Sequence, residues 1–521
     1  MVAKISPLLI AVKRRVDPFL PLAVILLVAA SLRLAYLWND VPPLFADEIE
    51  QYVSVHSIAT TGVDVDGRLR PFLYCRLDYN PPMYGIAGYT STLIFGNTPF
   101  GWRFPAVIFG LISIVLLFLV VRQVTKYNTI ALLSALLLAI EPDHIHFSRI
   151  GWEPAPNVLV CVLGAIWLSL SALRDRGKPL SFWKLVGAGI FLGLCPYTDQ
   201  SASFYAALLL GSLWILNVGR LHGIRNLLSI ATAIAIAFAI LTPALILTIT
   251  DPHAHDRGLR IATFANGING TTLLTFLHNY IVHFSWAYLV TSGSPQPRYL
   301  SGIGILYWWY VPLVALGVIC ASQYIRSRAL CWWLWFWLAI YPLGGALTND
   351  GVEPHAARTI AGTPALCIFA AIGMYAVWKT AERIRIGQLR RSIKVGLVSA
   401  TLLCACWSVW SFAVYYWTIY PVMSAREWES GAREAFAAVK IRQSNYRRLC
   451  MDGFSYWHIQ SMEQYFLPDT PLTVIENSAD PQCSQPGTLV LSTSAVSLPG
   501  FSVTNTFNGL DGRMFAVLEA H

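Results

Sequence analysis

The sequence Phe45-Ala46-Asp47-Glu48-Ile49-Glu50-Gln51-Tyr52 places three carboxylates within four residues, directly after the first long apolar segment of the chain. If that segment crosses a membrane, the acids lie at the far water–lipid boundary, where a carboxylate costs free energy unless it is paired or used. We interpret Asp47 as a general base at an extracytoplasmic active site. The alternative is a helix cap, because Asp47 followed by Glu50 fits a capping box and acids favour a first helical turn.

Composition places this segment in a polytopic membrane protein. The chain has 521 residues, of which 55% are hydrophobic and only 12% charged, whereas a soluble domain has about 25% charged residues. The net charge of +9 does not indicate a nucleic-acid partner. Most basic residues lie in short loops between apolar segments, where positive charge sets the orientation of the chain in the membrane.

Hydropathy predicts about eleven transmembrane helices, since a helix needs about 20 apolar residues to cross a bilayer. The first segment is too long for the core of a signal peptide, so we expect it to be retained. We expect an integral protein of the plasma (inner) membrane, with the N-terminus in the cytoplasm and the C-terminus outside. The predicted spans cover residues 18–38, 99–121, 128–141, 153–173, 182–197, 202–219, 226–249, 303–323, 330–346, 359–378 and 396–417.

Charge supports this topology independently. The inside segments are rich in lysine and arginine and contain few acids, as the positive-inside rule requires. The outside loops before residue 418 contain no lysine, but they contain Arg68, Arg70, Arg76, Arg103, Arg149, Arg257, Arg260, Arg298 and Arg358. Arginine without lysine is expected where a planar, always-charged fork binds phosphate or carboxylate. The alternative is that each arginine pairs with one of the outside acids, and both can hold at once.

The first outside loop, residues 39–98, ends in an apolar run from Met83 to Phe95 that is too short to span a bilayer. We predict an amphipathic helix lying in the membrane interface. The sequence Asn80-Pro81-Pro82 stops any helix before it. The same loop contains Asp64-Val65-Asp66, which by itself is weak support for a metal site.

Another outside loop contains His144 and His146, which suggest a metal site. Residues spaced by two share a face only on a strand, and no strand is expected there. Glu153 opens the fourth predicted span and cannot lie deep in lipid without a partner. Arg149 precedes it by one helical turn and is the expected partner.

Two later outside loops lead into predicted spans and carry further candidate residues. The loop before the eighth span contains Arg298 in a turn-rich segment. The loop before the tenth span contains His355 and Arg358, which share a helix face if the helix begins at Pro354, a favoured first position.

Composition changes after residue 417, so we predict a transmembrane domain over residues 1–417 and a small extracytoplasmic α/β domain over residues 418–521. The tail contains a predicted helix over residues 425–442 and strands at 448–451, 472–475, 488–492, 501–506 and 514–518. Cys450 and Cys483 lie in this tail and could form a disulfide if it is outside.

Taken in order, these features resemble the polyprenol-phosphate-sugar-dependent glycosyltransferases of the type C membrane fold. The group includes the protein O-mannosyltransferases and the lipid A aminoarabinose transferase. The resemblance covers roughly residues 20–380. It rests on the acids after span one, the amphipathic first loop, Ser148-Arg149 with Glu153, the loop with Arg358, and the segments 189–201 and 295–299.

The resemblance implies a lipid-linked sugar phosphate donor, an acceptor hydroxyl outside the membrane, and Asp47 as the base. The aminoarabinose transferase has a basic side chain beside the Pro-Pro of the first loop; Asn80 stands here, which argues against the same donor sugar. Trp308-Trp309 is followed by Tyr310 inside a span, so the Trp-Trp-Asp motif of oligosaccharyltransferases is missing, which argues against en bloc transfer to asparagine.

We therefore predict a membrane glycosyltransferase that moves a single sugar, a hexose or pentose, with inversion. The alternative is a membrane transporter of a polar or lipid-linked solute. We expect no metal and no cofactor beyond the lipid-linked co-substrate; the partners are the polyprenyl-phosphate-sugar donor, a glycan, lipid or protein acceptor, and membrane lipids. The predicted site comprises catalytic Asp47, Glu48 and Glu153, phosphate-binding Arg298, Arg358, Arg149, Arg257 and Arg260, and substrate-binding Asn80, His144, His146 and His355.

Overall fold

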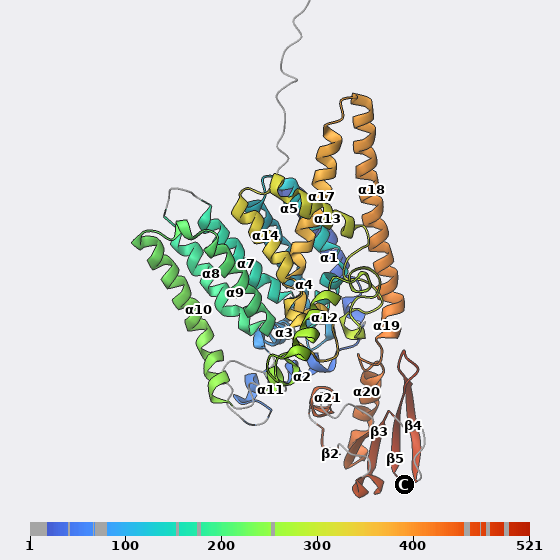
Figure 1. Ribbon diagram of the computed structural model, residues 1–521. Coiled ribbons are helices and arrows are strands. Elements are labelled where there is room, and N and C mark those ends of the chain that lie inside the picture. The colour runs from blue at the N-terminus through green and yellow to red at the C-terminus, as the bar shows by residue number, and fades with distance from the viewer. Residues whose placement is uncertain are drawn as a thin grey trace, which may run out of the picture.

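The chain folds into a bundle of long helices with a small sheet domain at one end (Figure 1). The structure, a computed structural model, describes residues 18–39, 42–65, 67, 81–152, 156–174, 179–251, 256–452, 459–468, 470–475, 480–493 and 500–520.

Six of the described helical segments are long and apolar enough to cross a membrane. They are Phe19–Asn39, Pro99–Val124, Ile224–Thr250, Arg328–Ala346, Thr363–Glu382 and Gly387–Met423. Five shorter apolar helices accompany them: Asn128–Ala139, Asn157–Leu173, Phe182–Tyr197, Ser201–Ile215 and Tyr310–Tyr324. Each predicted span overlaps one of these segments, so a mostly helical, membrane-spanning fold is confirmed, while the count of eleven spans stays a prediction.

The helices of the bundle alternate with short connections. Their bounds are α1 (Phe19–Leu34), η2 (Leu37–Asn39), α4 (Pro99–Val124), α5 (Asn128–Ala139), α7 (Asn157–Leu173), α8 (Phe182–Leu194), η4 (Cys195–Tyr197), α9 (Gln200–Ile215), η5 (Val218–Arg220), α10 (Ile224–Thr250), α13 (Tyr310–Tyr324), α14 (Arg328–Ile340), α17 (Thr363–Glu382), α18 (Gly387–Val414), η9 (Tyr415–Ile419) and α19 (Tyr420–Met423). The best-buried of the long helices is α17, which packs against α13 and α5.

One predicted span begins later than expected. Residues 303–309 are apolar but not helical, and α13 begins at Tyr310. The chain instead packs along η7 (Ala287–Thr291), where Leu306 N donates to the backbone oxygen of Leu289 at 2.8 Å. A Cβ on Gly304 would lie 2.3 Å from the backbone of Val290, so this close approach requires glycine. Hydropathy alone does not distinguish such a packed loop from a helix.

Short helices form the outside loops. They are α2 (Ala46–Thr61), α3 (Pro82–Phe95), α6 (Pro142–Phe147), α11 (Asp256–Ile261), α12 (Gly270–Val282), η8 (Pro297–Tyr299), α15 (Leu343–Ala346) and α16 (Ala356–Thr359). Figure 1 shows α2, α3, α11 and α12 at the end of the bundle that carries the sheet domain. The helix predicted for the first loop is present as α3, and its last turn exposes Leu93, Ile94 and Phe95.

The C-terminal domain is a five-stranded sheet in the order β2-β1-β3-β5-β4. Its strands are β1 (Arg448–Asp452), β2 (Thr473–Ile475), β3 (Thr488–Ser492), β4 (Phe501–Asn508) and β5 (Met514–Ala520), so all five predicted strands are confirmed. Strand β1 runs parallel to β2 and β3, and β5 runs antiparallel to β3 and β4. The sheet is accompanied by α20 (Ala432–Arg442), α21 (Ile459–Phe466), η10 (Gln443–Asn445) and η11 (Pro481–Ser484).

The predicted helix over residues 425–442 is shorter in the structure and begins at Ala432. The residues before it form a turn in which Glu429 has a φ of 47° and Gly431 a φ of 99°. Two left-handed residues cannot continue an α-helix, so the turn sets the direction in which α20 leaves. The sequence did not predict α21.

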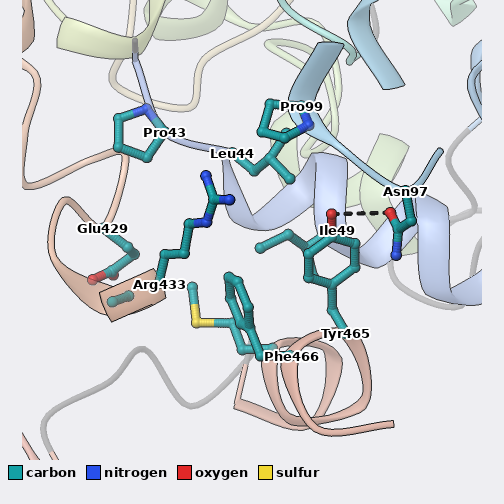
Figure 2. A pocket seen from close by; sticks show the side chains of 11 residues that line it. Pro43, Leu44, Ile49, Asn97, Pro99, Glu429, Arg433, Tyr465 and Phe466 are labelled. Carbon is teal, nitrogen blue, oxygen red and sulfur yellow. Dashed lines mark hydrogen bonds between the residues drawn. The ribbon is translucent and has the colours of Figure 1, made fainter. Parts of the chain in front are cut away.

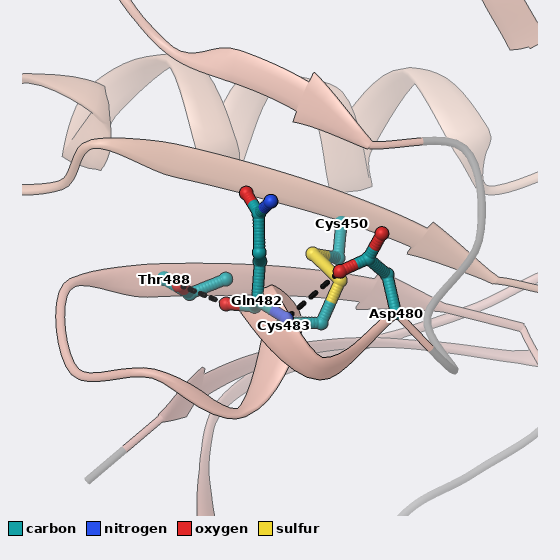
Figure 3. The surroundings of a disulfide bond; sticks show 5 residues. All are labelled: Cys450, Asp480, Gln482, Cys483 and Thr488. Atoms are coloured by element: carbon teal, nitrogen blue, oxygen red, sulfur yellow. Dashed lines mark hydrogen bonds between the residues drawn. A yellow bond between two sulfur atoms is a disulfide. The ribbon is translucent and has the colours of Figure 1, made fainter.

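A disulfide joins Cys450 of β1 to Cys483 of η11, as the sequence suggested (Figure 3). Both cysteines are fully buried among Val490, Ala516 and Leu518. The bond therefore attaches η11 to β1, an inner strand of the sheet.

The sheet domain shares a hydrophobic core with the first outside loop. Leu44 and Ile49, on either side of Asp47 in sequence, belong to the same buried cluster as Phe436 of α20 and Met462 of α21. The Tyr465 ring of α21 meets the Tyr52 ring of α2 edge-on at 5.2 Å, and its hydroxyl lies 3.1 Å from Asn97 Oδ1. The C-terminal domain is thus packed directly against the helix that carries Asp47.

Candidate active site

Helix α2 is capped by Glu48. The N-cap residue is Phe45, whose backbone N–H donates to Glu48 Oε2 at 2.8 Å. The capping box suggested for Asp47 and Glu50 is therefore wrong by two residues: the N-cap is Phe45, and the carboxylate at the third helical position is Glu48. Asp47 occupies the second position, where its half-buried side chain is not used to close this cap.

Arg103 of α4 holds Glu48 in a buried ion pair. Its Nε lies 2.9 Å from Glu48 Oε1 and its Nη2 lies 2.6 Å from Oε2, a bidentate geometry. The same guanidinium donates to the backbone oxygens of Pro42 at 2.6 Å and Pro43 at 2.7 Å. The N–H of Gly151 also donates to Glu48. This network fixes the chain on both sides of the first turn of α2.

Arg298 lies next to this turn in an aromatic cage. Its guanidinium carbon is 5.7 Å from the centre of the Phe45 ring, 5.6 Å from that of Trp152 and 5.0 Å from that of Tyr299. Trp152 and Tyr299 stack on each other with their centres 5.5 Å apart. Within the described part of the chain, no carboxylate pairs with Arg298, and its buried Nε has no hydrogen-bond partner. A half-buried cation held in this way can accept an anion.

His146 of α6 supports the loop that carries Arg298. His146 Nε2 donates to the backbone oxygen of Arg298 at 2.9 Å, because a carbonyl can only accept, and Nδ1 lies 3.2 Å from the hydroxyl of Tyr416. Burial lowers the pKa of His146 to about 3, despite the opposing effect of that backbone bond. The ring is therefore neutral near pH 7 and positions Arg298 without adding a charge.

His144 and Arg149 lie deeper in the bundle. His144 contacts Arg33 at 2.6 Å and Ser113 at 2.8 Å, on the opposite side of α6 from His146, as expected for residues two apart on a helix. Arg149 is buried, donates to the backbone oxygens of Leu32 and Arg33 at 3.1 and 2.7 Å, and lies over the ring of Tyr416. Its predicted partner, Glu153, is outside the described residues.

The loop before α17 brings His355 to the cage but directs Arg358 elsewhere. The His355 ring is 4.5 Å from that of Tyr299. His355 is the N-cap of α16, so this helix begins at Ala356, and the condition of a start at Pro354 is not met. Arg358 Nη2 lies 2.5 Å from Asp350 Oδ2, an ion pair at the surface of the loop.

The remaining predicted residues are not part of this cluster as the structure describes it. Arg260 is exposed on α11. The side chain of Arg257 and the whole of Asn80 are outside the described part of the chain. The structure thus brings together Asp47, Glu48, Arg298, His146 and His355.

Sequence reasoning missed the aromatic walls of the site. In the sequence, Phe45 and Trp152 stand out only because they lie near acidic residues, and Tyr299 only because it follows Arg298. The signal that could have found them is this adjacency of aromatic and charged residues at the ends of outside loops, where cation–π contacts are favoured.

Comparison with known proteins points to one fold. The family model described as dolichyl-phosphate-mannose-protein mannosyltransferase matches residues 79–247. The crystal structure of ArnT from Cupriavidus metallidurans in the apo state is similar over 96% of this chain and 97% of that chain, with a TM-score of 0.54 and 12% identity. The chain has the type C glycosyltransferase fold. No curated protein sequence matches it.

Two further solved structures of this type C fold were determined with a lipid phosphate. ArnT from Cupriavidus metallidurans bound to undecaprenyl phosphate matches 96% of this chain and 97% of its own, with a TM-score of 0.53 and 14% identity. The oligosaccharyltransferase AglB from Archaeoglobus fulgidus, in complex with an inhibitory peptide and a dolichol-phosphate, matches 91% of this chain and 69% of its own, with a TM-score of 0.55 and 13% identity. At this identity they establish the fold of the chain.

Proposed function

We propose that this protein is a membrane glycosyltransferase that moves a single sugar from a polyprenyl-phosphate donor to a hydroxyl of an extracytoplasmic glycan, lipid or protein. The observation that carries the proposal is the placement of Arg298, a caged guanidinium without a carboxylate partner in the described chain, beside the helix turn that bears Asp47. A base and an anion-binding cation at one site are what this transfer requires.

The reaction balances in a single displacement. Asp47 removes the proton of the acceptor hydroxyl as its oxygen attacks the anomeric carbon of the donor sugar. The bond from that carbon to the phosphate oxygen breaks, and the lipid monophosphate leaves with the electron pair, stabilised by Arg298. Attack opposite the leaving group inverts the anomeric centre.

An apolar groove supports a lipid donor. It has a volume of about 520 Å³ and lies among α8, η4, α9 and α10, with Leu192, Phe238 and Leu241 in its wall. Pro81, at the start of α3, closes one side, so the groove reaches the first outside loop. We place the prenyl chain there, because the related structures of ArnT and AglB were determined with undecaprenyl phosphate and dolichol-phosphate.

The other predicted site residues receive separate roles in this proposal. Glu48 is a positioning residue, because its carboxylate is occupied by Arg103 and two backbone N–H groups. His146 and His355 position the Arg298 cage. Arg149 and His144 stabilise the bundle beneath it. Of the remaining predicted residues, Glu153 stays a candidate catalytic residue and Asn80 a candidate for binding substrate. Arg358, Arg257 and Arg260 stay candidates for binding the donor phosphate.

We further propose that the site and the C-terminal domain lie outside the plasma membrane and that the N-terminus is cytoplasmic, as the distribution of lysine indicates. Purified protein in proteoliposomes with a polyprenyl-phosphate-sugar donor should transfer sugar to envelope acceptors. Mass spectrometry of envelope glycans and glycoproteins with and without the protein should identify the product. Solute flux without any transfer would instead support the transporter alternative.

A further inference from the structure

The structure contains a second pocket, separate from the Arg298 cage, between the C-terminal domain and the first outside loop (Figure 2). Its volume is about 200 Å³. The membrane domain contributes Pro43, Leu44, Ile49, Asn97 and Pro99, and the C-terminal domain contributes Glu429, Ala432, Arg433, Met462, Tyr465 and Phe466. Leu44 and Ile49 flank Asp47 in sequence, so the pocket lies against the segment that carries the proposed base.

The aromatic walls of this pocket are held in place. The Phe466 ring stacks on Phe436 at 5.0 Å with an interplanar angle of 16°. Tyr465 is fixed by Tyr52 and by the contact of its hydroxyl with Asn97. Rigid aromatic and apolar walls with a few polar groups are typical of a binding site for a small ring-shaped ligand.

Arg433 brings a guanidinium group to the pocket. Figure 2 shows its guanidinium extending toward Leu44, away from the carboxylate of Glu429. Glu429 is itself paired with Arg513 at 2.8 Å, which neutralises the acid at this wall. Arginine is exposed here and presents a planar fork suited to carboxylate or phosphate.

The turn that forms the Glu429 side of the pocket has an unusual backbone conformation. Glu429 has a left-handed φ of 47°, which is uncommon for a residue other than glycine. Gly431 has a φ of 99°, and a Cβ at this position would clash with the Phe515 ring at 2.8 Å. Such strained turns cluster at ligand-binding sites, and this one directs α20 so that Arg433 reaches the pocket.

We propose that this pocket binds a sugar residue of the acceptor that carries a carboxylate or a phosphate. Arg433 binds the anionic group, and Phe466 and Met462 contact the apolar face of the ring. The proposal rests on the proposed function, because the pocket can present an acceptor to Asp47 only if Asp47 acts on one. A bound acceptor would lie on the water-facing side, while the lipid donor enters from the groove at α8 to α10.

The test uses the full-length protein in nanodiscs and measures binding by ligand-observed NMR. The probes are glucuronic acid, glucose 6-phosphate, glucose and inorganic phosphate. We expect both anionic sugars to bind the unchanged protein and Arg426→Gln, an exposed arginine outside the pocket. Arg433→Gln should weaken both at least tenfold while leaving the unfolding temperature unchanged. No binding of either sugar, equal binding to Arg433→Gln, or equally good binding of inorganic phosphate overturns the proposal.

Binding of undecaprenyl phosphate, measured on the same variants, separates this proposal from the proposed function. We expect Arg433→Gln to bind the lipid as well as the unchanged protein does, since the groove and the cage are intact. If the anionic sugars bind as expected but no sugar transfer is detected, the proposed function fails and the pocket stands. If transfer occurs in full with Arg433→Gln, the pocket is not an acceptor site.

Discussion

The guanidinium of Arg298 lies 5.7 Å from the ring centre of Phe45, although 253 residues separate them in the sequence. Phe45 is the N-cap of α2, and Asp47 follows two residues later. This contact brings the anion-binding candidate of one outside loop to the base candidate of another. The proposed base and the proposed anion-binding cation therefore meet at Phe45, which begins the helix of the first and forms a wall of the cage around the second.

Arg298→Lys should weaken binding of the lipid phosphate by roughly tenfold or more. Lysine lacks the planar fork that stacks among Phe45, Trp152 and Tyr299 and that can bind phosphate through two N–H groups. The measurement is a titration of purified variants with undecaprenyl phosphate.

Arg358→Lys provides the matched comparison. Arg358 is already paired with Asp350, so its replacement should affect lipid binding less than that of Arg298. Equal affinity of Arg298→Lys and the unchanged protein would move the phosphate site elsewhere, with Arg257 or Arg260 as the next candidates.

Asp47→Asn should lower the rate of transfer about 10²–10⁴-fold, the usual effect of losing a general base. Lipid binding should be kept, because Glu48 caps α2 and Asp47 is not needed for that contact. The control is Glu434→Gln, a change at an exposed acid on α20. If Asp47→Asn retains more than about a tenth of the activity, Asp47 is not the base.

Glu48→Gln should destabilise the protein by about 3–5 kcal/mol, because it removes the negative charge from the buried ion pair of Glu48 with Arg103. Thermal unfolding in detergent measures the effect. In a double-mutant cycle, Arg103→Met should lower the unfolding free energy much less in the Glu48→Gln variant than in the unchanged protein. Additive losses would mean that Glu48 and Arg103 are not coupled, and that Glu48 is available for chemistry.

Hydropathy and charge predicted the bundle because both act locally along the chain. An apolar run indicates that the same residues are buried or contact lipid, and a short basic loop indicates on which side of the membrane it lies. The five strands of the C-terminal domain were predictable for the same reason. The late start of α13 was not, since the packing of Gly304 on Val290 depends on two segments that meet only in the fold.

The polar residues of the candidate site could be proposed from the sequence, but their arrangement in space could not. Asp47, Arg298 and His355 were selected as candidates because a charged or titratable residue beside an apolar span is expected to be paired or to take part in function. Arg298 and His355 contact the Phe45, Trp152 and Tyr299 cage from separate loops, and Asp47 follows Phe45 by two residues. The docking of Tyr465 on Tyr52 likewise could not be seen in a C-terminal tail that resembled a detached domain.

Lowering the pH from 7 to 5 should destabilise the protein, and His146 should contribute about 2 kcal/mol to that loss. Its folded pKa of about 3 lies below the ordinary value of 6.5, so the unfolded chain binds a proton that the folded chain excludes. This stability is present above pH 6.5 and is lost as the pH falls toward 3. His144, whose pKa burial also lowers, adds to the same trend.

Unfolding temperatures at the two pH values measure this dependence. His146→Gln should reduce the difference between them, although it does not remove the contribution of His144. His222→Gln, at an exposed histidine, should leave the difference unchanged. An identical pH dependence in the His146 variant would show that its ring is not buried and neutral.

Transfer should continue in excess EDTA after dialysis. Arg298 already supplies the cation that a divalent ion would bring to the departing phosphate. A monophosphate leaving group also carries less charge to neutralise than a diphosphate. The same assay with Arg298→Lys should show loss of transfer that added magnesium or manganese does not restore. Activity that is lost in EDTA and restored by either ion in the unchanged protein would replace this mechanism, and would make the acids of the first loop metal ligands.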